Sequence, residues 1–98
     1  MASSTETILW QVQEDDRGRW RDFPNHLMEM VELEYLKWIQ DGKPGQLVVA
    51  YSWPNAKGTA RQEYQIVCEE DGTETKMYQV NANMQTMRSV RRLVVKTD

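Results

Sequence analysis

Hydrophobic and polar residues alternate along much of this 98-residue chain, a pattern typical of strands with one buried face. The first alternation covers residues 8–13, and a second short strand is expected at 19–23, after a turn that ends in Gly18. These two segments predict a hairpin at the start of the fold.

One segment has helical spacing instead. Pro24 and Asn25 predict its start, with Asn25 as N-cap, and Gly42 is expected just after its end. Glu32 is expected to face mostly away from the core. The predicted buried face consists of Met28, Val31, Tyr35, Trp38 and Ile39.

The rest of the chain predicts only strands and turns. Strands are expected at 47–51, 63–68, 75–80 and 89–95, with turns at 53–58 and at Asp71–Gly72. We therefore predict an α+β fold, in which a strongly curved antiparallel sheet of about six strands packs around a single α-helix. Residues 8–95 are expected to form one domain, between a disordered start at 1–7 and a tail at 96–98.

The composition favours a small intracellular domain. Cys68 is the single cysteine, so no internal disulfide forms, which suits a nuclear or cytoplasmic protein. No apolar run approaches the roughly 18–20 residues of a membrane span, so no membrane association is expected. We expect a monomer.

Charge is distributed unevenly. The net charge is −3, but residues 1–83 hold 8 Lys and Arg against 14 Asp and Glu, whereas residues 84–98 hold four basic residues against Asp98. A broadly positive face for duplex nucleic acid is therefore not expected. The basic segment can focus on one anionic ligand, or it can be an ordinary solvated strand face.

The sequence carries no catalytic motif. His26 and Cys68 have no triad or metal-ligand spacing around them, and the glycines are scattered turn residues rather than a phosphate loop. The acidic run at 14–16 lacks the calcium-loop pattern. We expect no catalytic residues, no metal and no cofactor, and we expect a binding module rather than an enzyme.

Two groups of residues carry a family resemblance. Trp10 and Trp20 lie in the predicted hairpin, and Glu32 follows in the second turn of the helix, within Val31-Glu32-Leu33-Glu34-Tyr35. This order resembles the WWE domain, a module named for two tryptophans and a glutamate. The stretch with Tyr78-Gln79-Val80-Asn81, Met84-Gln85 and Arg88-Ser89-Val90-Arg91-Arg92 resembles the end of that domain.

The resemblance implies a function. WWE domains recognise the iso-ADP-ribose unit of poly(ADP-ribose) and occur in ubiquitin ligases and ADP-ribosyltransferases. The expected partners are therefore poly(ADP-ribose) or ADP-ribosylated proteins. By residue match, Tyr78 approaches the ligand, Gln85 hydrogen-bonds it and Arg88 lies near its phosphates. Arg92, on the same basic strand, is also expected to bind the ligand. Trp20 is mostly structural with one edge near the pocket. Glu32 is taken as structural.

A second hypothesis stays open. Val12 stands where the family commonly has an aromatic residue, and the interval from Tyr78 to Gln85 is shorter than usual. The same fold would then dock a protein partner through an apolar surface or an unpaired edge strand, with Trp53 as a candidate contact. The ligand hypothesis requires Arg88 to point toward Tyr78 across the sheet, where it would offer a two-pronged grip to a phosphate.

Overall fold

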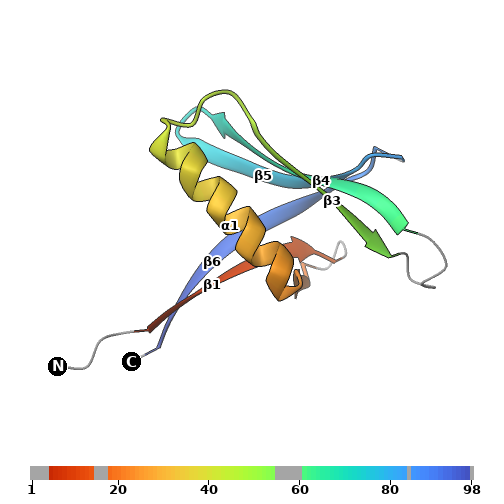
Figure 1. Cartoon of the computed structure of the whole chain (residues 1–98), viewed down its shortest axis with the longest axis horizontal. Helices are drawn as coiled ribbons and strands as arrows, with labels where there is room; N and C mark the ends of the chain where they lie inside the picture. Colours follow the sequence, from red (N-terminus) through yellow and green to blue (C-terminus); the bar gives the residue numbers. More distant parts are fainter. Residues whose placement is uncertain (1–4, 15–17, 55–60, 84, 98) are drawn as a thin grey trace.

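The computed structural model describes residues 5–14, 18–54, 61–83 and 85–97. Within them lie one helix and six antiparallel strands in the order β2-β1-β6-β5-β4-β3 (Figure 1). The elements are β1 (Thr5–Gln13), β2 (Trp20–Asp22), α1 (Asn25–Gln40), β3 (Leu47–Pro54), β4 (Arg61–Asp71), β5 (Glu74–Asn81) and β6 (Met87–Thr97).

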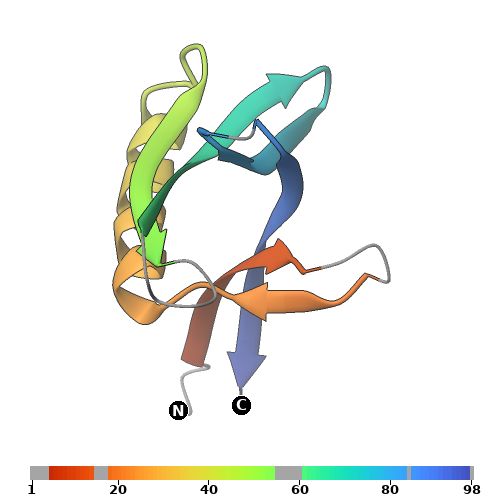
Figure 2. The ribbon, with the colours of Figure 1, turned by 90° about the vertical axis from the view of Figure 1, so that its right-hand side faces the viewer.

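The sheet curls strongly into a half-barrel, and α1 lies along it beside β3 (Figure 2). This confirms the predicted fold class. The curl gives the sheet an inner face, which turns toward α1, and an outer face. Because side chains alternate along each strand, register alone assigns most residues to one of these two faces.

The core lies between α1 and the inner face. Among the described residues, the largest fully buried side chains are Trp10, Ile66, Val31 and Cys68. Register places Val49 opposite Ile66, and Ile66 opposite Gln79, which in turn lies opposite Arg88. This row crosses four strands on the inner face, and it becomes polar toward β6.

The helix begins and ends at the predicted places, but its cap and its buried face differ in detail. Pro24 is the N-cap and makes no side-chain capping bond, so Asn25 is the first helical residue rather than the cap. At the other end, Gly42 has φ of 83°, and its N–H donates to Ile39 O at 3.0 Å while Lys43 N–H donates to Trp38 O at 2.8 Å. This bond pair is a Schellman motif, which confirms Gly42 as the residue after the cap.

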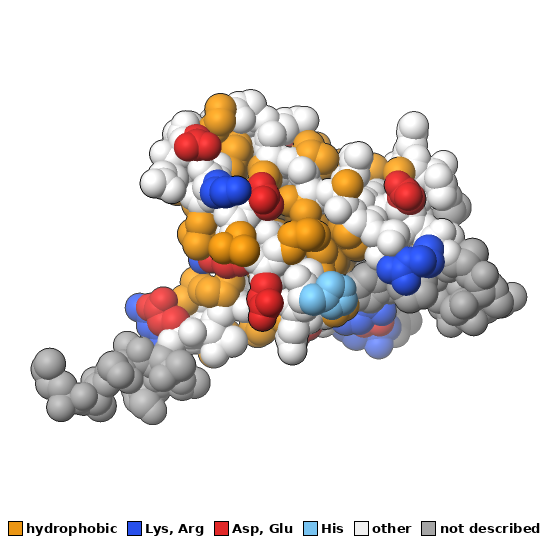
Figure 3. Space-filling model, viewed as in Figure 1, with side chains coloured by type: hydrophobic (Ala, Val, Ile, Leu, Met, Phe, Trp, Pro, Cys, Tyr) orange, Lys and Arg blue, Asp and Glu red, His pale blue; other side chains and the backbone are white. Residues whose placement is uncertain are grey.

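The buried helix residues are Leu27, Val31 and Trp38, with Met28 and Tyr35 packed beside them. The prediction missed Leu27 and wrongly placed Ile39 inside, since Ile39 is 39% exposed. Hydrophobic side chains also mark the outward face of the helix (Figure 3). Met30, Leu33 and Leu36 are exposed there, and none of them belongs to the predicted buried face.

The strands extend beyond the predicted bounds. Thr5 pairs with Thr97, and the ladder between β1 and β6 continues to Val12 opposite Val90. Residues 5–7 and 96–97 therefore belong to the sheet, because each end supplies the other with a partner strand. The backbone of Trp53 pairs with Gln62 in β3 rather than lying in a turn. The Trp53 side chain and residues 55–58 lie outside the described part of the structure.

The hairpin turn predicted at Asp71–Gly72 is present, with Gly72 and Thr73 as its two loop residues. Asp71 pairs with Glu74, which leaves a two-residue loop, and Gly72 has φ of 67°. Only glycine adopts this left-handed conformation without steric cost.

In the described part of the chain, no helix is long and apolar enough to cross a membrane.

Candidate functional site

Glu32 on α1 joins the helix to two strands. Its Oε1 accepts a hydrogen bond from Trp10 Nε1 at 3.0 Å. Arg92 on β6 donates from Nε to Oε1 at 2.8 Å and from Nη2 to Oε2 at 2.7 Å. Two parallel bonds of this kind are both strong and geometrically specific. We call Trp10, Glu32 and Arg92 the Glu32 cluster.

The Glu32 cluster is largely withdrawn from water. The side chains of Arg92 and Glu32 are 23% and 18% exposed. The hydrogen bond from Arg92 lowers the pKa of Glu32 and outweighs the burial that raises it. The same bond raises the pKa of Arg92, whose guanidinium carbon lies 5.2 Å from the Tyr35 ring centroid. Arg92 thus commits two of its three side-chain nitrogens to holding β6 against α1.

Trp20 lies on the outer face of the sheet. Trp20 pairs with Gln13 of β1. Gln13 follows the buried, inward-pointing Val12, so the side chains of Gln13 and Trp20 point outward. The Arg91 guanidinium carbon lies 4.2 Å from the Trp20 ring centroid, and Arg91 Nε donates to Gln11 Oε1 at 2.8 Å. Trp20 therefore anchors a layer of polar and aromatic side chains across β2, β1 and β6.

Tyr78 shares the outer face with Trp20. It pairs with Val67 on β4 and with Ser89 on β6. Ser89 precedes the inward-pointing Val90, so Ser89 and its partner Tyr78 point outward. Burial first, and the nearby Glu69 carboxylate second, raise the pKa of Tyr78. The Lys76 ammonium lies 5.5 Å from the Tyr78 ring centroid. β6 and β1 lie between Tyr78 and Trp20 in the sheet order, so the two rings do not form one pocket wall.

Gln85 occupies the turn between β5 and β6. It has φ of 56°, and its N–H donates to Asn81 O at 2.7 Å. Its side chain is exposed. Its neighbour Met84, part of the same sequence motif, lies outside the described residues.

Arg88 lies on the inner face, opposite Gln79 on β5. Tyr78 precedes Gln79 on β5 and therefore points to the outer face. Arg88 thus does not face Tyr78, which the sequence hypothesis required. A one-residue offset in a strand reverses the face, and the sequence cannot specify that offset. Arg88 Nη1 donates to Gln13 O at 3.4 Å and also to Glu14 O. The side chain is exposed at the end of the sheet.

A group of tyrosines and amides lies beside Arg88 on the inner face. The rings of Tyr51 and Tyr64 stack with centroids 5.6 Å apart and planes at 22°. Gln79 Nε2 donates to Tyr51 Oη. Tyr64 Oη and Asn81 Nδ2 donate to Gln62 Oε1 at 2.9 Å and 3.0 Å. We call these five residues the tyrosine cluster.

The tyrosine cluster joins the core on one side and Arg88 on the other. Phe23 packs edge-on against Tyr51 at 6.1 Å, and burial raises the pKa of Tyr51 to about 12, so its hydroxyl stays protonated at neutral pH. Gln79 lies between the tyrosines and Arg88, because its amide bonds to Tyr51 and its position on β5 is opposite Arg88 on β6. An aromatic surface, an amide and a guanidinium therefore adjoin on one face.

The sequence analysis missed Tyr51, Tyr64 and Gln79 as site candidates. Each falls in a correctly predicted strand, but three strands must be aligned before they meet. The connection between β3 and β4 contains no pairing signal that would set their register. Period-two alternation does place Tyr51 on the side of Val49, and Tyr64 on that of Ile66, which was the only usable signal.

The chain matches no protein-family model, no curated protein and no solved structure. Among the described residues, no group of three or more His, Cys, Asp or Glu side chains could hold a metal ion. Burial raises the pKa of Cys68 to about 12, which keeps its thiol protonated and unreactive as a nucleophile.

Proposed function

We propose that this domain is a non-catalytic module that binds poly(ADP-ribose) through its iso-ADP-ribose unit. The observation that carries the proposal is the tyrosine cluster beside Arg88 on the inner face. The order of Trp10, Trp20 and Glu32, which resembles the WWE domain, supports it. By that resemblance, the domain would direct a larger protein, such as a ubiquitin ligase, to ADP-ribosylated partners.

The proposed site suits each part of the ligand. Tyr51 and Tyr64 offer an aromatic surface to the adenine ring, and stacking of a base on such a surface contributes roughly 1–3 kcal/mol. The Gln79 amide adjoins that surface and suits the polar edge of the base, whereas the buried Asn81 amide is bonded to Gln62 and Asn83 and supports the cluster from behind. Arg88 uses Nη1 for the β1 carbonyls. Its Nε and Nη2 form the fork that fits a phosphate.

The site differs from the one expected by residue match. Arg88 keeps its role beside the phosphates, and Gln79 takes the hydrogen-bonding role that was assigned to Gln85. Arg92 is assigned to the Glu32 cluster and not to the ligand. Trp20 and Tyr78 are on the opposite face, so the inner-face proposal assigns them no ligand contact.

Calorimetric titration with iso-ADP-ribose tests the proposal, with two-dimensional NMR to locate the contact. We expect saturable heat and shifts centred on Tyr51, Tyr64, Gln79 and Arg88. Tyr64→Leu should weaken binding about tenfold or more because it removes one stacking ring. Lys96→Ala is the control for Arg88, because Lys96 is an exposed cation on the same strand, β6, and its loss should leave ligand affinity unchanged. The absence of heat and of shifts at millimolar ligand would reject the proposal.

A further inference from the structure

The outer edge of β1 is open beside α1. β2 pairs with β1 over residues 11–13, and Phe23 N–H donates to Trp10 O at 3.0 Å. Pro24 then has no N–H to continue the ladder, and the chain turns into α1. In the described ranges, no strand pairs with this edge of β1 at residues 6–9.

The backbone groups on this edge can be assigned. Glu14 N–H and Phe23 N–H bond across the boundary between β1 and β2, to Arg19 O and Trp10 O. The even-numbered residues of β1 therefore turn their backbone groups toward the β2 side, and the odd-numbered ones toward β6. The N–H and C=O of Glu6 and Ile8 consequently point to the open edge.

The next N–H along this edge has a poor acceptor. Trp10 N–H points at Met28 Sδ, 3.3 Å away. A thioether sulfur is a weak acceptor, and the methionine side chain is flexible enough to move aside. An entering strand could offer a carbonyl oxygen in its place. The edge thus presents strand-pairing groups that the described fold leaves without strong partners.

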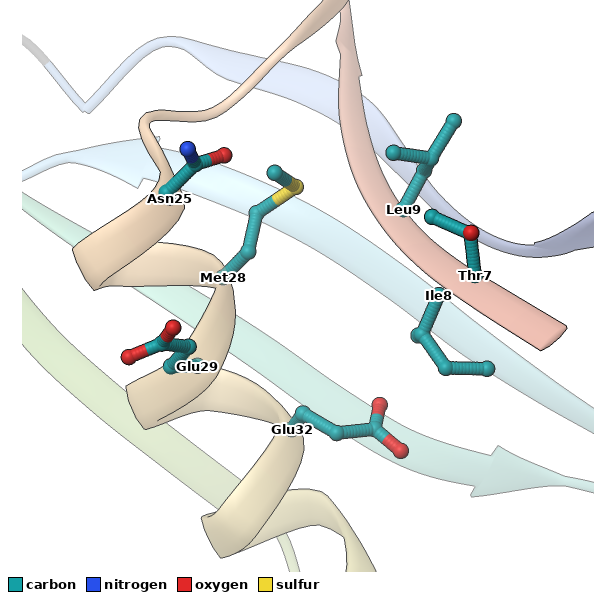
Figure 4. Close-up of a pocket in the computed structure, with 7 residues that line it drawn as sticks. All are labelled: Thr7, Ile8, Leu9, Asn25, Met28, Glu29 and Glu32. Carbon is teal, nitrogen blue, oxygen red and sulfur yellow. The ribbon is translucent and has the colours of Figure 1, made fainter. Parts of the chain in front are cut away.

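A groove of about 280 Å³ runs along this edge (Figure 4). Figure 4 shows Met28 and Glu32 reaching from α1 toward β1. Ile8 and Met28 give the groove an apolar floor, and Glu29 adds an exposed carboxylate at its rim, which Figure 4 shows on the side of α1 away from β1. Among the described residues, no cation lies within ion-pair distance of Glu29.

We propose that this groove binds an extended segment of a partner protein, which adds a strand to the sheet at β1 in line with β2. Backbone pairing with Glu6 and Ile8 provides the affinity, and the side chains provide selectivity. The segment carries an apolar residue beside Ile8 and Met28, and a lysine or arginine that reaches Glu29.

Charge favours a basic partner segment over a second copy of this chain. Residues 1–83 hold 14 acidic against 8 basic residues. Lys96 offsets Glu6 at 3.8 Å, but two copies paired through this edge would each present the same acidic groove with Glu29, and like charges facing each other are destabilising. The inference is independent of ADP-ribose binding, because the groove and Arg88 lie on different parts of the sheet.

NMR titration with a capped peptide that alternates threonine with valine and lysine tests this proposal. We expect the amides of Glu6, Ile8 and Trp10 to shift, and their hydrogen exchange to slow on binding. A peptide with glutamate in place of lysine should bind about fivefold more weakly, as expected for one exposed ion pair. If these amides do not respond to the lysine peptide at millimolar concentration, the proposal is wrong.

Two variants make the test specific. Glu6→Pro removes an N–H that faces the open edge, so the fold should persist while peptide affinity falls up to about tenfold. Thr7→Pro is the matched control for the edge assignment, because its N–H faces β6 and its loss should lower the unfolding temperature. Glu29→Lys should retain the fold and weaken the lysine peptide. If both Glu6→Pro and Glu29→Lys bind the lysine peptide as tightly as the unmodified protein does, the proposal is wrong.

The occupant and the independence of the site are tested together. Sedimentation of the free protein should show a monomer, and a dimer that Glu6→Pro dissociates would show that a second copy, not a partner segment, takes the edge. Arg88→Ala should leave peptide affinity unchanged. Glu6→Pro should leave iso-ADP-ribose affinity unchanged, so each proposal can fail without the other.

Discussion

Arg88 and Arg92 lie on the same face of β6, four positions apart, but their surroundings differ. Arg92 is 23% exposed and grips the Glu32 carboxylate with two nitrogens. Arg88 is exposed, and its hydrogen bonds within the described residues go to the backbone carbonyls of Gln13 and Glu14 at the end of β1. The difference follows from α1, which brings a carboxylate to Arg92. One strand face thus supplies an arginine for folding and an arginine that an anion can reach.

The largest expected effect is on the folding side of this comparison. Arg92→Met should lower the free energy of unfolding by about 2–3 kcal/mol, because Glu32 stays partly buried without its charge partner. The value is below that for fully buried pairs, since part of the cluster contacts water. Urea unfolding measures it. Arg88→Met is the control and should change stability by less than about 0.5 kcal/mol; equal effects would remove the distinction.

The binding side should show the reverse. Arg88→Ala should cost about 1.5–3 kcal/mol of iso-ADP-ribose binding, as for a hydrogen bond to a charged group, which is roughly a ten- to hundredfold loss. Arg88→Lys should not restore it, because an ammonium lacks the planar fork. Calorimetry gives both affinities, and thermal unfolding should stay near the starting value. Unchanged affinity in Arg88→Ala would remove this residue from the site.

The Glu32 cluster also predicts a pH dependence. The pKa of Glu32 is lowered below its ordinary value of 4.5 in the folded state, mainly by the bond from Arg92. The stabilisation is complete above that ordinary value, and it is lost as the pH falls through the lowered folded pKa. Glu32→Gln should lose this part of the acid response. Urea midpoints at neutral and acidic pH measure it, and an identical acid response in both proteins would contradict the assignment.

The fold was predictable where short-range chemistry decides it. Gly42 marks the end of α1 because a Schellman motif needs a left-handed residue there, and Asp71–Gly72 marks a tight hairpin. Spacing alone was less precise on the helix, because Leu27 and Ile39 both lie at the border of the apolar stripe. Packing against the sheet buries Leu27 and leaves Ile39 exposed.

The candidate site was only partly predictable, because it depends on register. Arg88 was identified from its basic segment, and it does lie at an exposed end of β6. Its neighbour across the sheet could not be known, since a shift of one residue exchanges Gln79 for Tyr78. The roles of Trp10 and Glu32 needed the helix and two strands in place, as three distant segments form one hydrogen-bonded cluster.

The smallest expected effect extends the comparison to Arg91, which lies between Arg88 and Arg92 in sequence order but on the outer face. Its guanidinium stacks on Trp20 at 4.2 Å. A cation–π contact between half-buried side chains contributes about 0.5–1 kcal/mol, so Arg91→Ala, which also loses the bond to Gln11, should reduce the free energy of unfolding by at least that amount. Trp20→Leu should remove the same contact, and the double variant should show that the two losses are coupled.

Arg91→Ala also separates the two faces as ligand surfaces. If iso-ADP-ribose binds at the tyrosine cluster on the inner face, this variant leaves its affinity unchanged while Arg88→Ala weakens it. A larger affinity loss in Arg91→Ala than in Arg88→Ala would move the ligand to the outer face, where Trp20 and Tyr78 lie. Stability and affinity measured on the same protein samples distinguish this result from partial unfolding, because an unfolding defect would weaken every ligand contact equally.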